Sequence, residues 1–278
     1  MKRRARIAVV VGVVAISFAA IFFRETAPMH PLVAAGLRLS IAALCLSPFI
    51  VRRWGSMAPS VRKGALLGGV FYALHFGTWV TSLTLTSVAA SVTLVTATPI
   101  LLATWAFITR VDRPSRLQVL AIGIAVVGVS VIGSQDSGGA IVGDALAFAG
   151  AAAMAGYLVI ARRQGDALDP MAFTGIACAV GGALLMLSTL AFGVPVAIPS
   201  TESFVFVLLA VVVPQLIGHT ALTWALRVLP PTRVGMATVA EPVGATLLAW
   251  TWLHEVPPTL TLVGCAITLS AVLLSLRE

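Results

Sequence analysis

Four ionisable side chains lie inside long apolar stretches of this sequence: Arg38, His75, His219 and Glu241. A charge at the centre of a membrane-spanning helix costs at least about 2.5–3.5 kcal/mol, so such residues are rare and usually functional. The guanidinium of Arg38 offers a planar fork of donors that matches a carboxylate or a phosphate. The carboxyl group of Glu241 could carry a proton or bind an ammonium group. The sequence therefore predicts ligand-binding chemistry in an apolar environment.

Both charged residues also have a structural interpretation. Arg38 could extend its side chain to the outer membrane interface instead of binding a ligand. Glu241 directly precedes Pro242, and its carboxyl group could bond to backbone groups that the proline frees. The sequence leaves these alternatives open.

The two histidines each share a helical face with another side chain that could contact a ligand. His75 lies four residues before Trp79, and His219 lies four residues after Gln215, a spacing that places both members of each pair on one face. A histidine beside an aromatic ring could line a pocket for a planar or cationic ligand, whereas hydrogen bonding between helices is the alternative. The predicted ligand-contacting residues are Arg38, Tyr72, His75, Trp79, Gln215, His219 and Glu241.

The composition indicates which elements must position these residues. Of 278 residues, 59% are hydrophobic and 10% are charged, against roughly 45–50% and about 25% in soluble domains. The mean hydropathy is +1.03. A membrane span needs about 20 apolar residues, so the chain can hold ten spans with little left for other domains. This composition argues against a soluble enzyme and against a disordered chain.

Apolar runs between proline, glycine and charged residues predict an all-α membrane protein with ten transmembrane helices. With alternating spans, sixteen of the eighteen Lys and Arg residues fall on one side; Arg24 falls on the other, and Arg38 within a span. The positive-inside rule then places both termini in the cytoplasm, in a bacterial-type inner membrane. It also explains the net charge of +8 without nucleic-acid binding. The predicted helices are 5–23, 32–51, 64–84, 88–109, 117–133, 144–161, 170–190, 204–226, 234–253 and 259–276.

The chain also contains an internal repeat. At an offset of 143, Pro99 aligns with Pro242 and Asp112 with Glu255; at an offset of 139, Pro31 aligns with Pro170. Two halves, residues 1–137 and 138–278, would each contain five spans. Because five is odd, the second half must enter the membrane inverted, as in secondary transporters with a substrate site near the midplane.

Three prolines fall inside predicted spans, where they remove backbone hydrogen bonds and kink the helix. Such breaks are tolerated beside a cavity lined by protein and could serve as hinges or gates. These prolines are Pro99, Pro214 and Pro242.

Several motifs resemble those of EamA-type members of the drug/metabolite transporter superfamily. They are Ala221-Leu222-Thr223-Trp224-Ala225-Leu226-Arg227-Val228-Leu229-Pro230-Pro231-Thr232-Arg233, Ala240-Glu241-Pro242, His254-Glu255, Gly143-Asp144-Ala145-Leu146-Ala147 and Thr98-Pro99. The resemblance implies ten helices in two inverted five-helix repeats, alternating access, and most often export of amino acids or related metabolites. The first half departs from the family pattern, with Val111-Asp112 in place of the common Gly-Glu.

These observations favour a secondary transporter that exports small amphipathic metabolites, with amino acids, aromatic or hydrophobic ones included, and related compounds as the best candidates. Efflux of lipophilic cations is the alternative, and a membrane scaffold or an intramembrane enzyme is the alternative of another class. The chain has no Walker A pattern, no catalytic motif and no metal-ligand spacing, so we expect neither catalytic residues nor a cofactor or metal. The expected partners are a small-molecule substrate and the lipid bilayer, with the protein as a monomer or homodimer.

Overall fold

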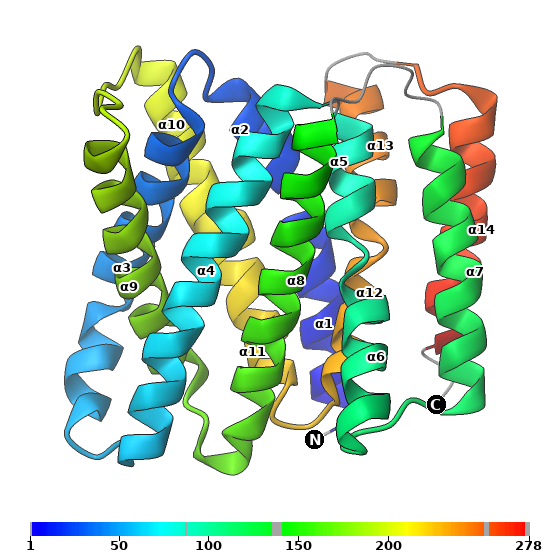
Figure 1. Cartoon of the computed structure of the whole chain (residues 1–278), viewed down its shortest axis with the longest axis horizontal. Helices are drawn as coiled ribbons and strands as arrows, with labels where there is room; N and C mark the ends of the chain where they lie inside the picture. Colours follow the sequence, from blue (N-terminus) through cyan, green and yellow to red (C-terminus); the bar gives the residue numbers. More distant parts are fainter. Residues whose placement is uncertain (1, 87, 135–140, 253–255, 276–278) are drawn as a thin grey trace.

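The computed structural model describes residues 2–86, 88–134, 141–252 and 256–275. The regular structure within these ranges is helical, and most helices run roughly side by side (Figure 1). Three sequence predictions lie outside the described residues: the boundary between residues 137 and 138, the His254-Glu255 motif and the basic residue Arg277.

The helices follow one another without intervening strands in the described part of the chain. They are α1 (Lys2–Ile16), α2 (Ala19–Glu25), α3 (Pro31–Trp54), α4 (Pro59–Leu85), α5 (Val88–Val95), α6 (Thr98–Thr109), α7 (Arg116–Gly133), α8 (Ile141–Arg163), a 3-10 turn (Gly165–Ala167), α9 (Pro170–Ala191), α10 (Thr201–Ala210), the π-helical segment η2 (Val211–His219), α11 (Thr220–Ala225), α12 (Pro231–Thr238), α13 (Glu241–Trp252) and α14 (Thr259–Ser275).

Seven helical stretches in the described residues are long and apolar enough to cross a membrane. They are Arg3–Glu25, Pro31–Trp54, Pro59–Leu85, Ser91–Thr109, Ile141–Arg163, Pro170–Ala191 and Thr201–Ala225. Two further apolar helices, Arg116–Ile132 and Thr259–Ser275, are shorter. The remaining predicted span, 234–253, is divided between α12 and α13.

Two of the predicted spans are interrupted at equivalent positions of the repeat. The span predicted at 88–109 breaks at residues 96–97, and the span predicted at 234–253 breaks 143 residues later, at 239–240. A proline ring clashes with the carbonyl group four residues before it. Pro99 therefore ends α5 at Val95, and Pro242 ends α12 at Thr238. Each of these two predicted spans is therefore two helices in the structure, as expected of prolines that remove backbone hydrogen bonds, and their role as hinges or gates stays a prediction.

Pro214 has a different effect, because it lies inside the π-helical segment η2. The wider turn of a π-helix accommodates the missing backbone hydrogen bond, and such turns often occur at functional sites. The predicted first span is also divided, between Ile16 and Ala19. There the hydroxyl of Ser17 donates to the carbonyl of Val13 at 2.9 Å, a local bond that tends to bend helices.

The helix pairs that pack most extensively follow the symmetry of the sequence repeat. α3 packs against α9 and α7 against α14, and each pair joins equivalent helices of the two halves. Two smaller contacts, α6 with α12 and α5 with α13, are equivalent to each other. The pair α4 and α8 has its equivalent in α1 packed against η2 and α11. At the contact of α4 with α9, a Cβ added to Gly69 would lie 2.4 Å from Cβ of Val180, so this close approach requires glycine.

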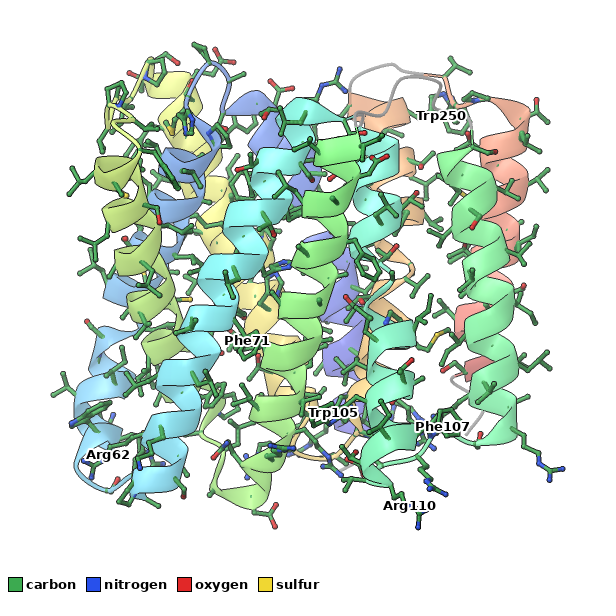
Figure 2. All side chains as sticks on the ribbon, viewed as in Figure 1. Arg62, Phe71, Trp105, Phe107, Arg110 and Trp250 are labelled. Carbon is green, nitrogen blue, oxygen red and sulfur yellow. The ribbon has the colours of Figure 1, made fainter. Side chains whose placement is uncertain are left out.

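The two ends of the bundle differ in charge. Arg62 and Arg110 lie at the end where α1 begins and α14 finishes, whereas Trp250 lies at the opposite end (Figures 1 and 2). Between the ends, large apolar side chains such as Leu44, Ile108 and Leu187 face outward. An apolar belt between one basic end and one less basic end is the surface expected of a protein in a bilayer.

Candidate functional site

A small cavity of about 40 Å³ lies where the broken helices meet the long helices α4 and α8. Four of the seven predicted ligand-contacting residues line it: His75, Trp79, His219 and Glu241. The other three, Arg38, Tyr72 and Gln215, do not line the cavity but lie behind its wall. The full lining is Ile16, Ala19, His75, Trp79, Val95, Thr96, Thr98, Met154, Tyr157, Leu158, His219, Leu222, Thr223, Thr238 and Glu241.

His75 and Trp79 form one wall of the cavity from α4. The His75 and Trp79 rings stack with centroids 5.8 Å apart and an angle of 12° between their planes. Nδ1 of His75 lies 2.9 Å from the carbonyl oxygen of Gly150 on α8, which requires Nδ1 to carry the proton. A Cβ on Gly150 would lie 3.2 Å from Cβ of Trp79, so the close approach of α8 favours glycine. The indole Nε1 of Trp79 is buried and has no hydrogen-bond partner among the described residues.

A pair of tyrosines connects α4 with α8 and α11. Tyr72 stacks on Tyr157 with ring centroids 4.1 Å apart, and the Tyr157 hydroxyl lies 2.8 Å from Oγ1 of Thr223. Tyr72 also lies edge-on to the His219 ring, with centroids 6.0 Å apart. Tyr72 therefore supports His219 and Tyr157, which line the cavity, rather than lining it.

Arg38 is fully buried behind this aromatic wall, at 0% exposure. Its Nη2 donates to Oε1 of Gln215 at 3.0 Å, and Nε2 of Gln215 lies 3.4 Å from Sγ of Cys178. The guanidinium carbon lies 4.4 Å from the ring centre of Phe76 and 5.2 Å from that of Phe23. The interpretation that Arg38 extends to the membrane interface is therefore wrong, because two rings and Gln215 hold it inside the bundle.

The guanidinium has hydrogen-bonding capacity left over. Within the described residues, Nε and Nη1 of Arg38 are buried without a hydrogen-bond partner. A buried donor without a partner costs about 1–3 kcal/mol, and more when it is charged. Phe76, whose ring lies beside the guanidinium, packs edge-on against His219, a lining residue of the cavity, with centroids 5.4 Å apart.

Glu241, an acidic residue, lines the cavity as the first residue of α13. Arg38 and Glu241 are close enough to interact electrostatically. Both residues are within the described chain, and they form no ion pair with each other. The repeat equivalent of Glu241 is Thr98, whose hydroxyl donates to the carbonyl of Val95 at 3.0 Å.

Sequence reasoning missed the hydroxyl groups of the cavity. Thr96, Thr98 and Thr238 line it from the two helix breaks, and the position of the prolines four residues after the helix ends could have located them. Thr223 belongs to the motif at residues 221–233, but its hydrogen bond with Tyr157 was not predicted. Among the described residues, no group of three or more His, Cys, Asp or Glu side chains is placed to hold a metal ion.

At the basic end of the bundle, one arginine connects three segments. Nε of Arg162, near the end of α8, lies 3.1 Å from Oδ2 of Asp112, which follows α6. Nη1 of Arg162 donates to the carbonyl of Leu226, which follows α11, also at 3.1 Å. These bonds link the ends of α6, α8 and α11 to one another at the basic end.

Comparison with known proteins gives two positive findings. The EamA-like transporter family matches the chain twice, over residues 3–134 and 141–277. A protein of known crystal structure is similar over 99% of this chain and 98% of its own, with a TM-score of 0.79 at 19% sequence identity. At that identity the likeness establishes the fold alone. No curated protein sequence matches the chain.

Proposed function

Because the chain belongs to the EamA-like transporter family, we propose that it is a secondary transporter exporting small amphipathic metabolites, with amino acids as the best candidates. Membership of the family makes it a multi-pass membrane transporter; the substrate class, direction and mechanism are our proposal. Alternating access to the central cavity is the mechanism that agrees with its inverted halves.

The proposed topology has ten spans in two inverted five-helix repeats, residues 1–137 and 138–278, with both termini in the cytoplasm of a bacterial-type inner membrane. Three observations support it. Most Lys and Arg residues fall on one side, the helix breaks are 143 residues apart, and the packing pairs exchange as a two-fold repeat requires.

One observation carries the proposed substrate class: a basic and an acidic residue lie at one cavity lined by aromatic rings, with Glu241 in the lining and the buried Arg38 behind the wall. Arg38 would bind a carboxylate through the nitrogens that have no partner, and Glu241 would bind an ammonium group or a proton. Trp79, His75 and His219 would shape the cavity between them. An amino acid carries both charges, so it complements this arrangement better than a simple anion or cation does.

The transport cycle would use the broken helices as hinges. Pro99, Pro214 and Pro242 stand at or beside the irregular backbone that borders the cavity, and irregular backbone in a membrane persists only where protein or water satisfies it. Since the chain lacks a Walker A pattern, the direction would come from an ion gradient, with protons carried by Glu241 as the simplest case, or from facilitated diffusion down the substrate's own gradient.

Efflux of lipophilic cations is the second candidate, and one observation favours it. Glu241 lines the cavity directly together with Trp79 and Tyr157, whereas Arg38 lies behind Phe76. In this state the cavity presents an acidic group and aromatic faces, which together attract organic cations.

Counterflow in proteoliposomes decides between these candidates. The full chain is reconstituted with a panel of labelled amino acids, with a lipophilic cation for comparison and with Glu241→Gln as the paired variant. Saturable amino-acid exchange that the variant loses supports the proposal and places Glu241 in the transport cycle. Exchange that survives in the variant assigns Glu241 a structural role beside Pro242. Movement of the cation alone favours the second candidate, and movement of nothing refutes both substrate classes.

A further inference from the structure

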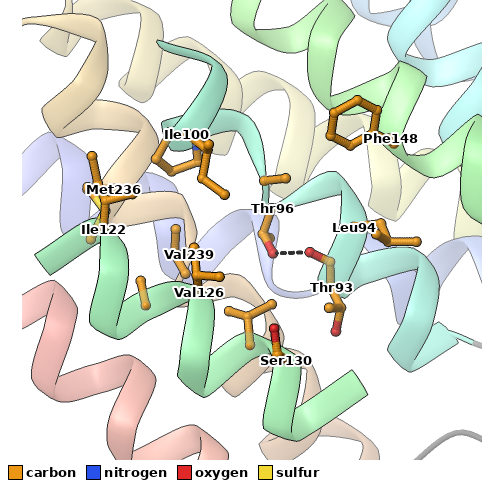
Figure 3. Close-up of a pocket in the computed structure, with 14 residues that line it drawn as sticks. Thr93, Leu94, Thr96, Ile100, Ile122, Val126, Ser130, Phe148, Met236 and Val239 are labelled. Carbon is orange, nitrogen blue, oxygen red and sulfur yellow. Dashed lines mark hydrogen bonds between the residues drawn. The ribbon is translucent and has the colours of Figure 1, made fainter. Parts of the chain in front are cut away.

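A second, larger cavity lies beside the central one. It is an apolar crevice of about 190 Å³ between the α5–α6 break, α7 and α12, with Phe148 of α8 at one side (Figure 3). Its walls are mainly Ile, Val, Ala, Leu and Met side chains. Three hydroxyl-bearing residues interrupt them: Thr93, Thr96 and Ser130.

The crevice and the central cavity meet at the helix breaks. Thr96 lines both of them, and its hydroxyl donates to the carbonyl of Thr93 at 2.8 Å (Figure 3). Val239, the repeat equivalent of Thr96, lines the crevice, while its neighbour Thr238 lines the central cavity. The partition between the two spaces is therefore one turn of irregular backbone from each half of the protein.

The crevice also opens toward the outside of the bundle. Ile100, Val126 and Phe148 line it and are 39%, 39% and 46% exposed. α7 packs chiefly against α14 and only lightly against α5 and α6. This side of the crevice thus faces the hydrocarbon of the membrane.

The volumes indicate what the two spaces can hold. An apolar cavity of about 150 Å³ accepts a benzene molecule, so the crevice is large enough for one aromatic ring or one branched aliphatic group. The central cavity, at about 40 Å³, has room for only a few polar atoms. Oγ1 of Thr93 is buried without a hydrogen-bond partner among the described residues. The acyl chain of a lipid has no polar group and would leave this hydroxyl without a partner.

We infer that the crevice is the specificity pocket for the apolar side chain of the substrate, and that the head group of the same molecule occupies the central cavity. The inference rests on the proposed function and narrows it, because the substrate class becomes amino acids with one aromatic or branched apolar side chain. The carboxylate and ammonium groups lie between Arg38 and Glu241, and the side chain passes the partition at Thr96 into the crevice.

Two neighbouring valines of α7 provide a matched test. Val126 lines the crevice, whereas Val127 does not and is 55% exposed. Val126→Phe and Val127→Phe in the full chain are compared in proteoliposomes by counterflow of phenylalanine and of alanine. We expect Val126→Phe to lower the selectivity for phenylalanine over alanine at least ten-fold, as closure of an apolar pocket does, and Val127→Phe to leave it within two-fold. Equal effects of Val126→Phe on both amino acids, or no effect, would overturn the inference.

A binding measurement separates this inference from the proposed transport. A phenylalanine analogue bearing a diazirine on its ring is irradiated with the wild-type protein, and the labelled residues are identified by mass spectrometry. The inference is supported if the analogue labels the crevice within residues 93–130, if excess phenylalanine prevents this labelling, and if Val126→Phe abolishes it. This holds even if the protein exchanges no amino acid in the counterflow assay and the proposed transport is wrong. Two results would overturn the inference: labelling outside the crevice, and labelling that excess phenylalanine does not prevent. In a parallel experiment with a phospholipid that carries a diazirine, labelling of the crevice that persists in excess phenylalanine would overturn it as well.

Discussion

Replacing Arg38 by methionine should remove the ability to distinguish a carboxylate from its ester. In the structure Nη2 of Arg38 is engaged by Gln215, while Nε and Nη1 have no partner in the described chain. A carboxylate oxygen bound to one of these nitrogens would form one charge-assisted hydrogen bond, worth about 1.5–3 kcal/mol. At about 1.4 kcal/mol for each factor of ten, the expected loss of affinity is roughly ten- to 150-fold.

The assay compares two ligands and three variants. Inhibition of counterflow by phenylalanine and by phenylalanine methyl ester is measured for wild type, Arg38→Met, Arg38→Lys and Gln215→Met. We expect the preference for the free acid to disappear in Arg38→Met and to be partly kept in Arg38→Lys, because lysine retains the charge without the planar fork. Gln215→Met removes the hydrogen-bond partner of Arg38 but leaves the charge of Arg38 in place. The preference for the free acid over the ester should therefore persist, while the melting temperature of the protein falls.

A purely structural role of Arg38 predicts a different result. If Arg38 only fastens α3 to η2, Arg38→Met and Gln215→Met will lower stability to a similar degree, and Arg38→Met will weaken both ligands equally. Equal weakening of acid and ester would refute the assignment of Arg38 to the substrate carboxylate, whatever the change in stability.

Three further predictions concern other parts of the molecule. Glu241→Gln should abolish the stimulation of exchange by a proton gradient, measured with and without an imposed pH difference; an unchanged stimulation would remove Glu241 from proton coupling. Arg162→Gln breaks the bonds to Asp112 and Leu226; if these bonds limit access to the central cavity, the variant should raise the reaction rate of a cysteine placed at Thr98 with a thiol reagent added from the basic end, and equal rates would refute that role. Gly69→Ala should destabilise the protein by about 1–3 kcal/mol through overpacking against Val180, whereas Gly123→Ala, with nothing within 4 Å of the added carbon, should not lower the melting temperature.

Much of the fold could be predicted from the sequence, because the signals that determine it are of two simple kinds. Some act locally, as a proline does, and others belong to the overall composition of the chain. A proline acts on the carbonyl four residues earlier, so Pro99 and Pro242 locate the ends of α5 and α12. Proline in the first turn similarly accompanies the start of α3 and α9. The break near Ser17 carries no such signal, since serine interrupts a helix only in a particular packing environment.

The candidate site could be predicted only in part. His75, Trp79, His219 and Glu241 are polar or aromatic within apolar runs, and that contrast identified them as cavity residues. The wall between Arg38 and the cavity could not be predicted, because Phe76 and Phe23 come from different helices and one phenylalanine in an apolar run looks like any other. The crevice was missed for the same reason: Val126 and Val127 are indistinguishable until the position of α7 is known.

The lengths of the helices have a consequence for the surrounding bilayer. α7 has 18 residues and spans about 27 Å at 1.5 Å per residue, whereas α4 has 27 residues and spans about 40 Å. Lipid adjusts its local thickness to the apolar length of the protein beside it. The membrane should therefore be thinnest along α7 and α14, where the crevice opens, and an amphipathic molecule leaving sideways would have its shortest path to the head groups there.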